Sequence, residues 1–234
     1  MDNIRWGIVG IGKIGRALTH QLQSTGITLS FFHPNPLKAE SFKEDFPYTE
    51  ALSKNELSSV SVLLLALPAH GIIPFLHELK SEGISLQHTL LVNLATVMPT
   101  PTLRAEFPEL DWLGLKFMGH SEDLRLHGNA LFVADAQTAQ GEKAKQTIQL
   151  FEQIGKVIID DESVVEKLNK LATYHAIKAA KELEKELQSL GYPREYQDRA
   201  IAAIAPEVMR SYVQGTMGHF AKTIADSFDN SRGD

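Results

Sequence analysis

Hydrophobic and polar positions follow two different patterns along the chain. Through the first two thirds, short apolar runs are separated by amphipathic stretches, which is typical of strands and crossover helices in a parallel sheet. The apolar runs predict strands at residues 4–9, 28–32, 60–67, 89–93, 112–117, 131–134 and 156–159. Residues 62–67 contain no polar position, so we expect helices on both faces of that strand, as in the middle of a doubly wound sheet.

From residue 161 onward the period becomes helical. Apolar residues recur at spacings of three and four, and no strand pattern returns. Residues 160–163 offer capping oxygens at the start of this helix, and residues 191–193 break it. A further helix is predicted over residues 194–214, bent or split at Pro206.

These patterns predict an α/β protein in two parts, and a length of 234 residues fits about two domains. Residues 1–160 are predicted to form a Rossmann-type domain with a doubly wound, mainly parallel sheet. Residues 161–234 are predicted to form a small all-α dimerisation domain.

Composition narrows the functional classes. Hydrophobic residues make up 43% and charged residues 22%, as in an ordinary globular protein. The absence of cysteine excludes disulfides and thiolate nucleophiles, and the scattered histidines form no metal-binding motif, so we expect no metal. A net charge of −6 argues against nucleic acid as a partner. Without a leader pattern or a long apolar run, we expect no membrane association and a cytoplasmic location.

A glycine-rich turn follows the first predicted strand and opens the first helix. It has the pattern GxGxxG, over Gly10, Ile11, Gly12, Lys13, Ile14 and Gly15. In this context the first glycine makes a tight turn, the second lets a diphosphate approach the backbone, and the third lets the helix pack on the strand. Amide groups at the positive end of the helix dipole would then face the phosphates. We predict a dinucleotide site; the alternative is a structural turn without a ligand.

The loop after the second predicted strand bears on which dinucleotide is bound. His33 lies 18 positions beyond Gly15, where an NAD-specific fold usually carries Asp or Glu. His33, Asn35 and Lys38 can instead donate hydrogen bonds to a 2′-phosphate. We therefore predict NADP rather than NAD; the alternative is a proline-rich turn that leaves specificity open.

Three segments resemble pyrroline-5-carboxylate reductases: the glycine-rich turn, residues 65–70 and residues 154–158. The resemblance covers most of residues 4–165 at the level of pattern. It implies an NADP-binding Rossmann domain, a helical domain that forms a dimer, and a substrate bound between them. Deazaflavin-dependent NADP oxidoreductases and 3-hydroxyacid dehydrogenases share the first domain. At the strand ends we also expect cofactor contacts from Ala66, Leu67, Pro68 and Asn93.

The sequence departs from that family where the family binds its substrate. Met118-Gly119-His120 stands in place of a Met-Pro-Asn segment, and residues 171–176 replace a glycine- and serine-rich helix start. Residues 215–218 are at best a remnant of the late glycine- and threonine-rich motif, and we expect the family's C-terminal part to be truncated. The substrate and the direction of reaction therefore stay open.

Three residues are candidates for proton transfer. Lys178 lies where the hydroxyacid dehydrogenases place a catalytic lysine, although Lys181 and Glu182 stand where that family has asparagines. His120 follows a predicted strand on the rim where ligands meet the carboxyl ends of strands. His175, beside Tyr174, is the third. For each, the alternative is an ordinary structural or solvated side chain.

The C-terminal helices carry more apolar residues than a small helical unit can bury alone, which predicts a homodimer. We predict an NADP-dependent oxidoreductase that transfers a hydride to or from a small imine, carbonyl or hydroxy acid. The alternative is a non-catalytic NADP-binding regulator that has kept the fold and lost the substrate loops.

Overall fold

The computed structural model describes residues 4–128 and 130–230. Its strands are β1 (Trp6–Val9), β2 (Leu29–Phe32), β3 (Glu50–Ala51), β4 (Val62–Leu65), β5 (Leu90–Asn93), β6 (Asp111–Met118), β7 (Ala130–Asp135) and β8 (Gly155–Asp160). Its α-helices are α1 (Lys13–Leu22), α2 (Pro36–Asp45), α3 (Ala69–Ser81), α4 (Thr100–Glu106), α5 (Ser121–His127), α6 (Glu142–Glu152), α7 (Ser163–Ser189), α8 (Arg194–Arg199), α9 (Ala205–Gln214) and α10 (His219–Asn230). The chain divides into two compact units, Met1–Lys170 and Leu171–Asp234.

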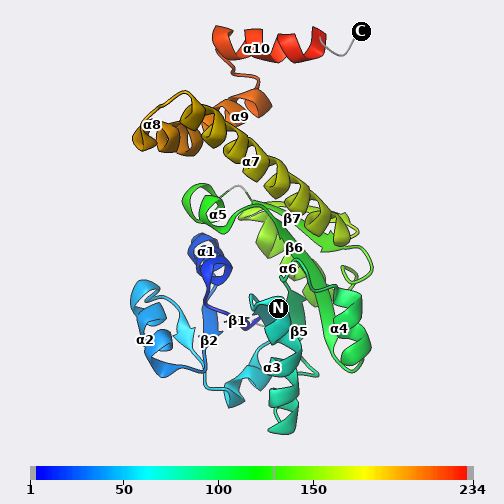
Figure 1. The fold of residues 1–234 in the computed structure, drawn as a ribbon. Helices are drawn as coiled ribbons and strands as arrows, with labels where there is room; N and C mark the ends of the chain where they lie inside the picture. The colour runs from blue at the N-terminus through cyan, green and yellow to red at the C-terminus, as the bar shows by residue number, and fades with distance from the viewer. Residues whose placement is uncertain (1–3, 129, 231–234) are drawn as a thin grey trace. The chain divides into compact units, whose positions relative to one another are not determined.

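The first unit is built on one sheet with the strand order β3-β2-β1-β4-β5-β6-β7-β8. Neighbouring strands are parallel except β6 and β7, which are antiparallel. The order turns back on itself between β1 and β4, which defines the switch point of a doubly wound Rossmann-type sheet. The predicted fold class is therefore confirmed, and Figure 1 shows these strands running from β1 in blue to β6 in green.

Helices cover both faces of the sheet because its central strands are apolar on both sides. In β4, Val62 and Leu64 pack into the core under α1, α5 and α6, whereas Leu63 and Leu65 pack under α3 and α4. All four side chains are fully buried, as the unbroken apolar run predicted. Each predicted strand occurs within two residues of its predicted ends. Among the strands of the described residues, the pattern missed only the short edge strand β3, whose residues are exposed and carry no apolar alternation.

From α7 onward, the described part of the chain is helical. Before α7 begins, the Asp161 carboxylate accepts the Ser163 N–H at 2.8 Å, so the predicted cap is present. Gly191 has φ 76° at the break after α7. Residues 194–214 are helical as predicted, with a π segment, Ala200–Ile204, just ahead of Pro206. The predicted domain boundary at 160/161 marks the change of sequence pattern, while the two compact units divide inside α7. In the described part of the chain, no helix is long and apolar enough to cross a membrane.

Candidate functional site

The glycine-rich turn joins β1 to α1 in a conformation that needs glycine at two positions. Gly10 has φ 98°, and a Cβ there would lie 2.4 Å from the carbonyl oxygen of Ala66. A Cβ on Gly15 would lie 1.9 Å from the carbonyl oxygen of Gly10. Gly12, by contrast, has no atom within 4 Å of the position of a Cβ. Gly10 and Gly15 therefore permit close packing, whereas Gly12 leaves open space beside the first amides of α1.

That open space belongs to a cleft of about 1070 Å³ at the carboxyl ends of β1, β2 and β4. Many of the residues predicted to bind the cofactor line it: Gly10, Ile11, Gly12, Lys13, Ile14, His33, Asn35, Lys38, Ala66, Leu67 and Pro68. The cleft lies at the topological switch point, where doubly wound sheets bind their ligands. Tertiary structure thus brings the turn, the loop after β2 and the end of β4 to one place.

The loop between β2 and α2 is organised by its own polar groups. The Asn35 N–H donates to Nδ1 of His33 at 3.0 Å, and Asn35 Oδ1 accepts the Lys38 N–H at 3.1 Å. His33 Nδ1 also lies 3.2 Å from the Asn35 carbonyl oxygen, and the nitrogen of the Asn35 side-chain amide keeps its donors. Arg16, which sequence reasoning missed, also lines this cleft and lies 2.5 Å from the Asp45 carboxylate. Its position directly after the third glycine of the turn was the feature of the sequence that could have identified it as a cleft residue.

A second pocket of about 390 Å³ shares five residues with this cleft: Ile14, Ala66, Leu67, Pro68 and Ser121. It adds three polar side chains: Thr96 after β5, His120 after β6, and Asn169 of α7. His120 caps α5, since its Nδ1 accepts the Glu122 N–H at 3.4 Å. Neutral His120 therefore carries its proton on Nε2, the nitrogen left free to donate. The cleft thus continues into a pocket with polar groups suited to a small substrate.

Helix α5 keeps His120 near the glycine-rich turn. The side-chain amide of Gln21, in α1, donates to the Leu124 carbonyl oxygen of α5 at 2.8 Å. Leu124 is itself buried in the core that includes α1. Because α1 begins at the turn and α5 begins after His120, this contact fixes the spacing between the two parts of the site.

A buried polar cluster lies behind the second pocket. Lys116 of β6 is 1% exposed and donates to the carbonyl oxygens of Ala95 and Met98 at 2.8 and 2.9 Å. Its Nζ lies 3.5 Å from the carboxylate of Glu162, which is 7% exposed. Burial lowers the pKa of Lys116 from its usual 10.5 to about 8, although Glu162 opposes the change.

Asn93, which was predicted to contact the cofactor, has its side chain in this cluster. Its side chain has no exposed surface. The amide nitrogen donates to Met98 and Thr100 at 2.8 and 2.9 Å, and the amide oxygen accepts the Ala95 N–H at 3.2 Å. The side chain therefore holds the loop after β5 from within, because its hydrogen-bonding groups are occupied there.

The other two catalytic candidates lie in the second unit. His175 and Lys178 are both on α7 with exposed side chains. Lys178 lies 3.8 Å from Glu182, one helical turn further on, which is the usual pairing on a solvated helix face. Their catalytic roles remain predictions.

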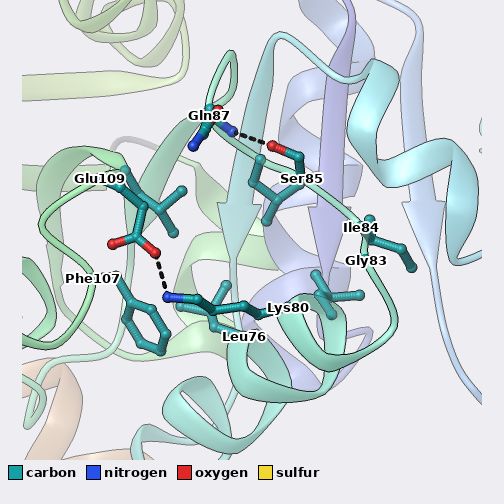
Figure 2. Close-up of a pocket in the computed structure, with 11 residues that line it drawn as sticks. Leu76, Lys80, Gly83, Ile84, Ser85, Gln87, Phe107 and Glu109 are labelled. Atoms are coloured by element: carbon teal, nitrogen blue, oxygen red, sulfur yellow. Dashed lines mark hydrogen bonds and ion pairs between the residues drawn. The ribbon is translucent and has the colours of Figure 1, made fainter.

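A further pocket of about 220 Å³ lies at the amino ends of β5 and β6, away from the cleft. Figure 2 shows its apolar lining, including Leu76 and Phe107, and the ion pair between Lys80 and Glu109, whose atoms are 2.7 Å apart. Ligands of doubly wound sheets bind at the carboxyl ends of strands, so the cleft at the switch point is the candidate site.

Known proteins share this fold. Residues 5–96 match the family model described as NADP oxidoreductase, coenzyme F420-dependent. No curated protein sequence matches the chain. A pyrroline-5-carboxylate reductase from Coxiella burnetii has a TM-score of 0.70 and 16% identity, and the match covers 97% of this chain and 85% of that one. The predicted resemblance to these reductases is therefore confirmed.

Two further structures resemble the chain and contain a cofactor. Plasmodium falciparum pyrroline carboxylate reductase with NADP bound has a TM-score of 0.65 and 15% identity, with 96% of this chain and 84% of that one covered. An imine reductase from Myxococcus stipitatus in complex with NADP+ has a TM-score of 0.65 and 16% identity, with 90% and 78% covered. At these identities the comparisons establish a common fold, that of a Rossmann domain followed by helices.

Proposed function

We propose that the protein is an NADP-dependent oxidoreductase that transfers a hydride between the nicotinamide and a small imine, carbonyl or hydroxy-acid substrate. The observation that carries the proposal is the cleft at the switch point, with open backbone at Gly12 and a polar pocket continuing from it. The description of the matched family and the reductases with the same fold agree with an oxidoreductase.

Charge in the loop after β2 supports NADP over NAD. The cleft carries cationic or donor groups at Arg16, His33, Asn35 and Lys38. The nearby carboxylate of Asp45 is paired with Arg16 and is thereby partly neutralised. A 2′-phosphate is attracted by such groups, whereas the carboxylate typical of NAD sites would repel it.

The cofactor would supply the hydride. The protein must therefore bind and orient the cofactor and the substrate, and it must transfer one proton. His120 is placed for the last task, because its Nε2 is the free nitrogen and its side chain lines the second pocket. Reduction of an imine or carbonyl adds the hydride to carbon and a proton to nitrogen or oxygen. His120 with both ring nitrogens protonated would give that proton from Nε2 and keep the one on Nδ1, in place of the hydrogen bond from the Glu122 N–H. Thr96, Ser121 and Asn169 would orient the polar atom of the substrate. His175 and Lys178 stay as alternative proton donors.

The second unit supports a homodimer. Within residues 171–228, only Gln197 has a buried side chain. Large hydrophobic side chains are exposed throughout: Leu171, Tyr174, Ile177, Leu190, Tyr192, Tyr196, Ile204, Val208, Met209, Tyr212, Val213, Phe220, Ile224 and Phe228. Helices with so little apolar burial gain little stability by themselves, and a second copy of the chain is the partner we propose.

Calorimetric titration with NADPH and NADH, followed by assays with imines, aldehydes and hydroxy acids, tests the proposal. We expect NADPH to bind more tightly than NADH and at least one substrate to be turned over. His120→Ala should lower kcat more than it weakens NADPH binding, and Lys178→Ala provides the parallel test of the alternative donor. Failure to bind either nucleotide would refute the proposal. Tight NADPH binding without turnover of any substrate would instead favour the regulator.

Light scattering of the wild-type protein at micromolar concentration tests the dimer. We expect twice the chain mass for wild type and for Lys185→Glu, which changes an exposed polar position. Val213→Asp combined with Phe220→Asp should give the mass of one chain, since both exposed apolar side chains become charged. A monomeric wild type would contradict the assembly.

A further inference from the structure

The buried ion pair of Lys116 and Glu162 has no part in the hydride and proton transfer described above. Burial of two charges is costly unless they are paired and hydrogen-bonded, and removing one partner is strongly unfavourable. Here both conditions are met, because each group also holds backbone atoms of one nearby segment. That segment is residues 95–100, between β5 and the first residue of α4.

The pair holds both ends of this segment. The Lys116 ammonium donates to the carbonyl oxygens of Ala95 and Met98. The Glu162 carboxylate accepts the Thr100 N–H at 2.5 Å and the Thr100 hydroxyl at 2.7 Å. Lys116 can reach the segment because β6 continues past β5, whose last residue pairs with Gly114. The conformation of the segment is therefore set from behind by two opposite charges.

The same segment forms a wall of the second pocket. Ala95, Thr96 and Val97 line that pocket together with His120 and Ser121. The pocket adjoins the cleft that contains the glycine-rich turn. The residues proposed above to bind the 2′-phosphate lie in another part of that cleft. A change in the segment would therefore alter the pocket next to the reacting groups and leave the loop after β2 in place.

We propose that Lys116 is a positioning residue, whose ammonium group, paired with Glu162, holds residues 95–98 in the shape that receives the nicotinamide end of the cofactor. The proposal rests on the proposed function, because it assumes that the cleft binds NADP. It assigns Lys116 no contact with substrate or cofactor.

The charge on Lys116 matters for this role. Hydrogen bonds from a charged donor are about twice as strong as neutral ones, and a neutral amine would leave the Glu162 carboxylate buried without its partner. Two charged groups act on Lys116: Glu162, which precedes α7, and Asp135, which ends β7. The uncharged Asn93 of β5 shares the Met98 carbonyl oxygen with Lys116, and Thr100 of α4 shares the Glu162 carboxylate with it. Because the pKa of Lys116 is about 8, its charge is lost at moderately alkaline pH.

The experiment compares the affinity for NADPH with that for adenosine 2′,5′-bisphosphate, which keeps the 2′-phosphate end and lacks the nicotinamide. In wild type, NADPH should bind more tightly than the fragment at pH 7. Lys116→Met should reduce this preference by about tenfold or more, with fragment affinity unchanged. Leu57→Ala is the matched control: it removes a fully buried side chain near the amino end of β4, so it should lower Tm without changing the preference.

Measurement across pH adds a second test that does not need Lys116→Met to fold. In wild type the preference for NADPH should fall as pH rises through about 8. Both ligands carry the same 2′-phosphate, so its ionisation cancels. Glu162→Gln keeps an acceptor for Thr100 and removes the negative partner of Lys116, so the midpoint of this fall should move to lower pH.

The outcomes separate the two proposals. If wild type binds neither ligand, the proposed function fails. If wild type binds both, but Lys116→Met weakens both equally or neither, Lys116 does not position the nicotinamide end. An unchanged pH midpoint in Glu162→Gln would equally overturn the inference.

Discussion

Replacing Gly12 with alanine should weaken NADPH binding strongly while leaving the fold intact. The residue has φ −75° and ψ −164°, which alanine adopts without strain, and a Cβ would meet no atom within 4 Å. Alanine lowers the conformational entropy of the unfolded chain and so favours the folded state, whereas the N-cap position favours glycine. Because these effects oppose each other, the free energy of unfolding should change by about 0.5 kcal/mol or less. The methyl group would, however, project into the cleft where the diphosphate must approach the backbone. Loss of hydrogen bonds to a charged phosphate costs about 1.5–3 kcal/mol, or roughly 10- to 100-fold in Kd.

Gly15→Ala provides the contrast. Its Cβ would lie 1.9 Å from the Gly10 carbonyl oxygen, so α1 must move relative to the turn. We expect the free energy of unfolding to fall by about 1–3 kcal/mol or more. Urea unfolding followed by circular dichroism, without cofactor, measures stability, and calorimetric titration measures NADPH affinity. Wild-type affinity in Gly12→Ala, or a large loss of stability there, would refute the assignment of Gly12 to diphosphate approach.

Three further predictions concern the buried cluster and the loop after β2. In Gly114→Ala the Cβ would lie 2.2 Å from the Glu162 carboxylate. The free energy of unfolding, measured in urea, should therefore fall by about 2–4 kcal/mol. The control is Gly141→Ala, whose Cβ would have no atom within 4 Å and which should change the free energy of unfolding by less than about 1 kcal/mol. The pKa of Lys116 is about 8 in the folded protein, whereas its usual value of 10.5 applies to the unfolded chain. Between these two pH values the unfolded state binds more protons than the folded state. The free energy of unfolding therefore rises with pH, by at most about 3 kcal/mol. Urea midpoints at pH 7.5 and 9.5 should show this rise in wild type and not in Lys116→Met; equal changes in both would exclude Lys116 as the source. Asn35→Asp keeps the oxygen that caps α2, so Tm should not change. The added negative charge should lower the ratio of NADPH affinity to NADH affinity by about tenfold. An unchanged ratio would place the 2′-phosphate elsewhere.

Local pattern was sufficient for most of the fold. The unbroken apolar run in β4 predicted a strand covered on both faces, because a strand buried on both sides leaves no position for a polar side chain. The glycine spacing predicted the turn between β1 and α1, because positive φ and close backbone contact leave few residue types possible. The exposed strand β3 was missed because its pairing with β2 uses backbone groups that carry no side-chain pattern.

The buried cluster could not be derived in the same way. A lysine within the apolar strand Asp111–Met118 was a visible irregularity, but its partner Glu162 is distant in sequence and precedes another helix. Asn93 ends a strand at the edge where ligands bind, which favoured a cofactor contact, yet its amide is used inside the protein. Sequence periodicity determines which residues share a face of a strand or helix, since that depends on neighbours along the chain. Which charges meet behind the pocket was settled by packing, because it depends on segments that come together only when the sheet and its helices assemble.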